Sequence, residues 1–135
     1  LAEPTMIIAS DGMPYAPGAH PRSAGTFARV LGRYVREQGV LSLPEAIRKM
    51  TLLPAQRIEH AAPAASRQGR IQLGMDADIT AFDPATVADQ ATFEDGLAFS
   101  SGIEFVVVNG TVVVDRGETV AGEHPGRPLF GTLSE

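Results

Sequence analysis

The spacing of hydrophobic residues predicts two helices in the first half of the chain. The first covers 26–38, where apolar residues recur every three or four positions, at Phe27, Val30, Leu31, Tyr34 and Val35. This spacing places them on one helical face. Gly39 follows as a natural C-terminal cap. We expect the arginines on the other faces to stay in water: Arg29, Arg33 and Arg36.

The second predicted helix begins at a capping motif. In Ser42-Leu43-Pro44-Glu45 the serine oxygen can accept a backbone N–H, while Glu45 reaches back to the serine. Pro54 ends this helix and can open another turn through Ile58. We expect the helix to bury four apolar side chains: Leu43, Ala46, Ile47 and Met50.

Short β segments dominate the remainder. A buried strand is predicted at 5–10, followed by a loop over 11–25. After a connector of small residues over 61–67, strands are predicted at 79–82, 103–108 and 111–115. Asn109-Gly110 favours a type I′ turn, which makes the last two strands a hairpin. Their triple valines predict burial on both faces, and the tail over 122–135 shows no periodicity.

Composition and charge argue against several classes of function. The net charge is −5 and the basic residues are scattered, so nothing indicates a nucleic-acid partner. No apolar run approaches the roughly 20 residues that span a bilayer, which argues against a membrane partner. No secretion signal opens the chain. We therefore expect a cytoplasmic protein. The absence of cysteine excludes disulfides and thiolate metal sites.

Asp11 is the first candidate for chemistry, because it ends the predicted strand at 5–10 and a polar loop follows it. Strand ends and the loops after them carry the catalytic groups of α/β barrels. Asp11-Gly12 is also a common turn sequence. A lone histidine such as His20 is more often a surface or core residue than a ligand. The histidines His20, His60 and His124 lack the spacing of a zinc site, which needs three or four protein ligands.

The order of these features resembles the C-terminal part of the metal-dependent amidohydrolases. Gly69-Arg70-Ile71-Gln72-Leu73-Gly74-Met75-Asp76-Ala77-Asp78-Ile79 resembles the return of such a chain from its (β/α)8 barrel to a small β-sandwich. Further motifs are similar to those of the D-aminoacylases (N-acyl-D-amino-acid deacylases): Ser10-Asp11-Gly12, His20-Pro21-Arg22, Arg33-Tyr34-Val35-Arg36-Glu37, Thr92-Phe93-Glu94, Gly102-Ile103 and Pro125-Gly126-Arg127.

The resemblance implies roles for two residues. Asp11 matches the catalytic, metal-proximal aspartate of the family, a general acid/base and at most a weak metal ligand. Arg22 matches the substrate-binding arginine that holds the α-carboxylate of an N-acyl amino acid. His20 lies in the same motif and receives no role. The resemblance implies zinc in the full-length enzyme, on ligands carried by earlier strands, and no tight metal binding to this chain alone.

The resemblance also implies an α+β fragment of a larger enzyme. Residues 1–60 would be the last strand, loop and helices of a (β/α)8 amidohydrolase barrel, and 61–135 the C-terminal half of a composite β-sandwich. Since the chain begins at Leu1 rather than Met, we expect it to be the final portion of the enzyme. The fragment alone should be inactive and should self-associate through the face bearing Phe27, Val30, Leu31 and Tyr34. Two alternatives stay open: an amidohydrolase acting on cyclic amides, in which Arg22 is a loop arginine, and a non-catalytic accessory β domain.

Overall fold

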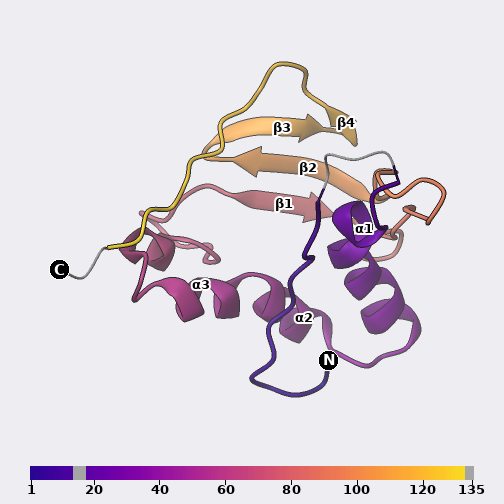
Figure 1. The fold of residues 1–135 in the computed structure, drawn as a ribbon, viewed down its shortest axis with the longest axis horizontal. Coiled ribbons are helices and arrows are strands. Elements are labelled where there is room, and N and C mark those ends of the chain that lie inside the picture. The colour runs from indigo at the N-terminus through magenta and orange to yellow at the C-terminus, as the bar shows by residue number, and fades with distance from the viewer. Residues whose placement is uncertain (14–17, 133–135) are drawn as a thin grey trace.

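The computed structural model describes residues 1–13 and 18–132. The chain forms α1 (Arg22–Arg29), the π-helix η1 (Val30–Glu37), α2 (Leu43–Met50), α3 (Leu52–Ile58), the 3₁₀-helix η2 (Pro63–Arg67), β1 (Ile79–Phe82), β2 (Ile103–Val108), β3 (Thr111–Asp115) and β4 (Glu118–Thr119). The strands form one antiparallel sheet in the order β1-β2-β3-β4. Helices α2 and α3 lie along its β1 side, and α1 stands beside one end (Figure 1).

The predicted hairpin is confirmed. Asn109 and Gly110 have φ of 47° and 79°, as a type I′ turn requires, and they join β2 to β3. A second turn of the same kind was not predicted. Arg116 and Gly117 have φ of 50° and 82° and join β3 to the short β4. Arginine is an unusual residue for positive φ, so its type alone does not indicate this turn.

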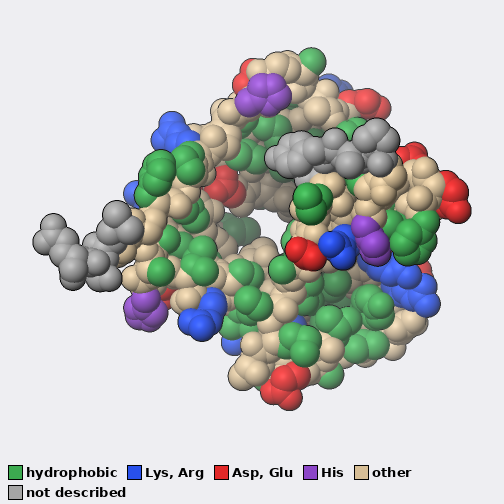
Figure 2. Space-filling view, in the orientation of Figure 1, with side chains coloured by type: hydrophobic (Ala, Val, Ile, Leu, Met, Phe, Trp, Pro, Cys, Tyr) green, Lys and Arg blue, Asp and Glu red, His purple; other side chains and the backbone are tan. Residues whose placement is uncertain are grey.

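The sheet is less buried than its valines predict. The described strands contain no buried residue, and Val112 is half-exposed. The expectation of burial on both faces is therefore wrong for this chain. Hydrophobic side chains surround a hollow between the sheet and the helices (Figure 2). A pocket of about 440 Å³ lies here, lined mainly by apolar residues, among them Phe27, Leu31, Ile47 and Ile79.

The first predicted helix is confirmed, but it begins earlier than predicted. Helix α1 starts at Arg22, directly after Pro21, and its first turn carries no apolar periodicity that would reveal it. The predicted loop over 11–25 therefore ends at residue 21. Val30 and Leu31 are buried, and Phe27 is half-exposed. Gly39, with φ of 60°, ends the helix as predicted, and its N–H donates to the carbonyl of Val35.

Helix α2 begins as predicted, and Leu43 and Met50 pack against the hydrophobic core as expected. The N–H of Glu45 donates to Ser42 Oγ at 3.4 Å, which is one half of the capping motif. The Glu45 carboxylate lies near Arg48 instead of reaching back to the serine. Ala46 is buried, whereas Ile47 is exposed and Lys49 is fully buried. The prediction for Ile47 is wrong because this face of the helix opens onto the pocket rather than the core.

Residues 5–10 do not form the predicted strand. Most of the segment has no regular secondary structure, and Ile8 donates its N–H to the carbonyl of Lys49 at 3.1 Å. A strand is defined by a ladder of bonds to a neighbouring strand, and the described residues place none beside it. The segment instead passes α2 on its way toward α1 (Figure 1).

The long connection between β1 and β2, residues 83–102, packs against α1 and η1; we call this connection the excursion. Val87 lies in the hydrophobic core beside Ala28, Val30 and Leu31. A Cβ added at Gly32 would lie 2.7 Å from the carbonyl oxygen of Val87, so only glycine permits this approach. The helix and the excursion therefore form one packed unit.

Two of the exposed arginines also bind this excursion. Arg36 Nη1 donates to the carbonyl of Val87 at 2.6 Å, and Arg29 pairs with Asp89 at 2.7 Å. The hydrogen bond to Asp89, together with its negative charge, raises the pKa of Arg29 above its usual value. All three arginines are exposed as predicted, but these two contacts were not predicted because their partners lie more than fifty residues away in the sequence.

The tail forms no regular element over 122–132, as predicted, and its last residues lie outside the described part. It runs back toward η2, where Thr132 donates its N–H to the carbonyl of Ala61 (Figure 1). No helix among the described residues has the length and apolar character needed to cross a membrane.

Candidate functional site

The structure brings the two predicted site residues into contact. Arg22 Nη2 lies 3.0 Å from Asp11 Oδ2, and Arg22 Nε donates to the backbone carbonyl of Asp11 at 2.9 Å. The Asp11 side chain is 87% exposed and the Arg22 side chain 44% exposed. Exposed ion pairs contribute about 0–1 kcal/mol to stability, so this pair is not needed to hold the fold together.

Asp11 has an uncommon backbone conformation. Its φ is 50°, in the left-handed region that non-glycine residues rarely adopt. Gly12 permits the turn to approach α1, because a Cβ there would lie 2.9 Å from the Cα of Ser23. Ser23 Oγ also accepts the N–H of Met13 at 3.1 Å. Positive φ at a non-glycine residue often marks a functional site, and here it turns a carboxylate outward.

His20 lies at the start of α1, next to Arg22. Its Nδ1 accepts the backbone N–H of Arg22 at 3.1 Å, and its carbonyl accepts the N–H of Ser23 at 2.9 Å. The first N–H groups of a helix have no partner within the helix. Pro21, the N-cap residue, makes no side-chain capping bond. His20 therefore supplies the acceptors for both donors.

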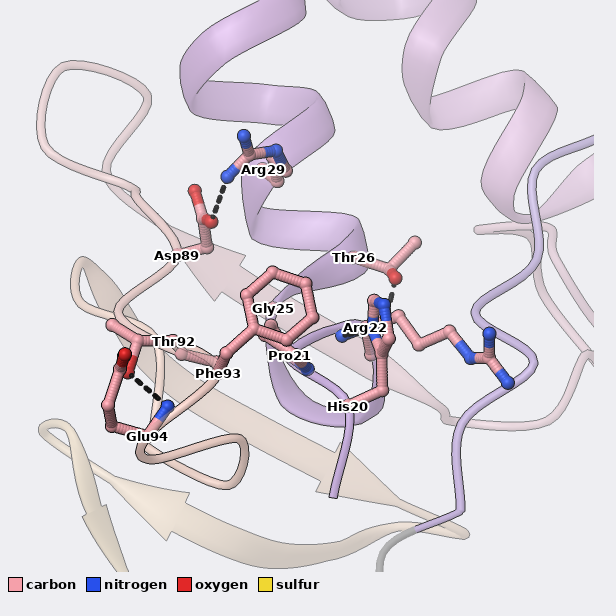
Figure 3. Close-up of a pocket in the computed structure, with 11 residues that line it drawn as sticks. His20, Pro21, Arg22, Gly25, Thr26, Arg29, Asp89, Thr92, Phe93 and Glu94 are labelled. Carbon is pink, nitrogen blue, oxygen red and sulfur yellow. Dashed lines mark hydrogen bonds and ion pairs between the residues drawn. The ribbon is translucent and has the colours of Figure 1, made fainter. Parts of the chain in front are cut away.

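A second pocket, also of about 440 Å³, lies next to His20. Its wall is formed by the start of α1 and by residues of the excursion, including Phe93. The His20 and Phe93 rings meet edge to face, with centroids 5.1 Å apart and an interplanar angle of 78°. The guanidinium of Arg22 points away from this pocket (Figure 3). Arg22 is among the residues that line this pocket and Asp11 is not, so the contact between their side chains lies beside the pocket.

The metal-ligating residue types stay apart. Across residues 1–13 and 18–132, no three His, Asp or Glu side chains gather closely enough to hold a metal ion. Asp11 is the carboxylate available at the predicted site. His20 Nδ1 is already used by the Arg22 N–H.

The sequence indicated Asp11 and Arg22 but not the residues that surround them. Phe93, Asp89 and Arg29 line the neighbouring pocket without having been predicted to do so. Thr92-Phe93-Glu94 had been noticed only as part of the family resemblance. One local signal was available: Thr92 Oγ1 accepts the N–H groups of Glu94 and Asp95, a turn that threonine favours.

Comparison with known proteins places the chain in a family. The amidohydrolase family profile matches residues 3–114. The chain therefore belongs to the amidohydrolase family. It is 46% identical over 131 residues to a D-aminoacylase from Alcaligenes xylosoxydans xylosoxydans, across 97% of this chain and 26% of that protein. It is 44% identical over 129 residues to an N-acyl-D-aspartate deacylase from the same organism, across 96% of this chain and 25% of that protein.

Solved structures give the same result and confirm the predicted resemblance to the D-aminoacylases. The crystal structure of D-aminoacylase matches with a TM-score of 0.86 and 43% identity, across 96% of this chain and 26% of that chain. An N-acyl-D-glutamate deacylase from Bordetella bronchiseptica, solved with zinc and a phosphonate mimic of the tetrahedral intermediate, matches with a TM-score of 0.83 and 41% identity, across 95% of this chain and 26% of that chain. D-aminoacylase itself has a binuclear metal centre. The chain spans about a quarter of the length of these relatives.

Proposed function

We propose that this chain is the C-terminal part of a zinc-dependent hydrolase that cleaves the amide bond of N-acyl-D-amino acids, giving a carboxylate and a D-amino acid. The observation that carries the proposal is the pairing of Asp11 with Arg22 at 3.0 Å. In a chain similar to D-aminoacylases over nearly its whole length, this contact would bring the proposed proton acceptor beside the proposed carboxylate-binding group.

The proposal includes the division of the chain. Residues 1–60 would complete a (β/α)8 barrel, and 61–135 would form the C-terminal part of a small β-sandwich. The segregation of helices before residue 68 and strands after residue 78 supports this division. The helical core also includes Val87, so the two parts would share an interface through the excursion.

The residues present are compatible with zinc but supply only one ligand. The Asp11 carboxylate is exposed and offers the oxygen that zinc accepts from aspartate. The remaining ligands would come from the part of the enzyme outside this chain. When bound, zinc lowers the pKa of water and polarises the carbonyl to be attacked. The chain alone would then bind zinc weakly and would not hydrolyse the substrate.

Asp11 would serve as the general base and acid. Its carboxylate would accept the proton of the attacking water and return it to the nitrogen of the leaving amine. The left-handed turn at Asp11 and the close contact at Gly12 support this role, because they hold the carboxylate in one position without burying it.

Arg22 would hold the α-carboxylate of the substrate. The backbone carbonyl of Asp11 accepts from Nε, and its carboxylate pairs with Nη2. Nη1 makes no hydrogen bond to any residue that the structure describes. A planar guanidinium can bind a carboxylate with two parallel hydrogen bonds. The edge formed by Nη1 and Nη2 would take the substrate while Arg22 keeps its bond to the carbonyl of Asp11.

Replacement of Asp11 tests the catalytic role in the full-length enzyme. Asp11→Asn keeps the shape of the side chain but removes the proton acceptor, so kcat should fall by about 10²–10⁴-fold. The measurement is steady-state hydrolysis of N-acetyl-D-amino acids, with Glu3→Gln as a matched change of an exposed carboxylate in the same segment. An Asp11→Asn enzyme with unchanged kcat would contradict the role.

Replacement of Arg22 tests the substrate class. Arg22→Lys keeps the charge but loses the two parallel bonds, and Arg22→Ala loses both, so KM should rise at least as much as kcat falls. Substrates whose carboxylate is converted to a carboxamide should be nearly indifferent to either change. Equal losses on both substrates would make Arg22 a structural loop arginine, and hydrolysis of hydantoins instead of N-acyl-D-amino acids would favour the cyclic-amide alternative.

A further inference from the structure

We propose that His20 and Phe93 are positioning residues that fix the start of helix α1, and with it Arg22, for binding the carboxylate of the substrate. The inference rests on the proposed function of Arg22 and assigns a role to His20, which the sequence left without one. Neither residue touches the Asp11 carboxylate in the described contacts, so both would act through Arg22.

The backbone of Arg22 depends on the His20 side chain. Pro21 separates the two residues and cannot donate a hydrogen bond, and it makes no side-chain cap. The Arg22 N–H therefore goes to His20 Nδ1, at 3.1 Å. Nδ1 must carry a lone pair to accept this bond, so the proton of the neutral ring lies on Nε2. Any side chain without an acceptor at this point leaves the first N–H of α1 without its partner.

The orientation of the His20 ring depends in turn on the excursion. Phe93 meets the ring edge to face (Figure 3). Phe93 is 75% exposed, so core packing does not explain its position. Edge-to-face contacts between aromatic rings are favourable beyond the burial of area. Phe93 would therefore restrict the rotation of the ring that holds Arg22.

The excursion is itself fixed to the helix on both sides of Phe93. Asp89 pairs with Arg29 at 2.7 Å. Thr92 closes a turn with Glu94 and Asp95 through its hydroxyl. At Gly96 the backbone approaches the carbonyl of Ala19 so closely that a Cβ would not fit between them. The excursion thus supports His20, two residues before the proposed carboxylate-binding Arg22, through contacts between residues far apart in the sequence.

Two substitutions test separately the hydrogen-bond acceptor and the aromatic ring of His20. His20→Phe keeps an aromatic ring against Phe93 but has no acceptor for the Arg22 N–H. His20→Asn loses the ring but keeps an acceptor suited to the N–H two residues later. In the full-length enzyme, His20→Phe should raise KM for N-acetyl-D-amino acids by roughly 3- to 10-fold, the size of one lost hydrogen bond. kcat should change less than twofold, and His20→Asn should recover most of the loss.

The sharpest test asks whether the effect of His20→Phe depends on the presence of Arg22. Residues that act on one another show non-additive effects. His20→Phe should therefore have little further effect in an Arg22→Ala background or on the carboxamide substrate, and Phe93→Leu should reproduce part of the rise in KM. A similar loss from His20→Phe in both backgrounds and on both substrates would overturn the proposal.

A second measurement needs no activity. In the full-length enzyme, hydrogen exchange of the Arg22 backbone amide should be several-fold faster in His20→Phe, whereas His20→Asn should leave it near the original. An unchanged Arg22 amide in His20→Phe would overturn the positioning role. A changed amide in a protein whose full-length form does not hydrolyse N-acyl-D-amino acids would instead contradict the proposed function alone.

Discussion

At the residue scale, Lys49 shows how one side chain can organise a segment remote in sequence. It is fully buried on α2, yet its ammonium is bonded: Nζ donates to the carbonyls of Glu3 and Met6. Glu45 Oε1 lies 3.9 Å away on the same helix. Buried lysines are rare unless paired. Together with the bond from Ile8 to the Lys49 carbonyl, these contacts hold the segment that leads to Asp11.

Removal of this ammonium should destabilise the fold. Lys49→Met keeps a long apolar chain but leaves two carbonyls without a donor, which should lower the free energy of unfolding by about 1–3 kcal/mol. The measurement is urea unfolding, with Arg48→Met as the matched control on the exposed face of the same helix. That control should change stability by about 0.5 kcal/mol or less. Equal stabilities of the two variants would mean that Lys49 does not hold the segment.

At the element scale, glycines decide how the 83–102 excursion meets the helices. Glycine in a helix is ordinarily unfavourable, and replacement by alanine gains up to about 1 kcal/mol. At Gly32 the replacement by alanine should destabilise the fold instead, because the new Cβ would lie 2.7 Å from the Val87 carbonyl and 3.2 Å from Arg36 Nη2. Gly32→Ala should therefore lower the free energy of unfolding by about 1–3 kcal/mol, as overpacking does.

Thermal or urea unfolding checks this change. Gly126→Ala is the control, because no atom lies within 4 Å of a Cβ added there. It should leave stability nearly unchanged. A Gly32→Ala chain as stable as the original or more so would show that the excursion can move away from η1, and would weaken its role in supporting Phe93.

At the scale of the whole molecule, exposed apolar surface predicts self-association. The predicted contact face needs revision, because Val30 and Leu31 are buried. Phe27 remains half-exposed at the apolar pocket, and Ile71 and Leu73 on the loop before β1 are almost fully exposed. Contiguous apolar patches and open strand edges favour association. We expect dimers or larger species of the 135-residue chain.

Light scattering over a concentration series measures this association. Ile71→Asn with Leu73→Asn should shift the chain toward monomer, because both changes remove apolar area from the same loop. Phe99→Asn, at an exposed position in the excursion, is the control and should shift it less. A chain that stays monomeric at high concentration would contradict the expectation.

The sequence by itself determined the elements whose physics is local. The type I′ hairpin needs two residues that tolerate positive φ, which Asn109-Gly110 supply. The helix ending at Gly39 and the Ser42 cap likewise depend on residues a few positions apart. The motifs around Asp11 and Arg22 were sufficient to indicate the family, and the contact between these residues agrees with placing both at one site.

The tertiary structure alone decided how these elements meet. The burial of Lys49, the docking of the excursion and the contact of His20 with Phe93 each join residues distant in sequence; Arg29 and Asp89 are sixty positions apart. Periodicity reports which face of an element is apolar but not what that face will meet. For the same reason the apolar run at 5–10 predicted a strand, although a strand forms only where another strand lies beside it to complete its hydrogen bonds.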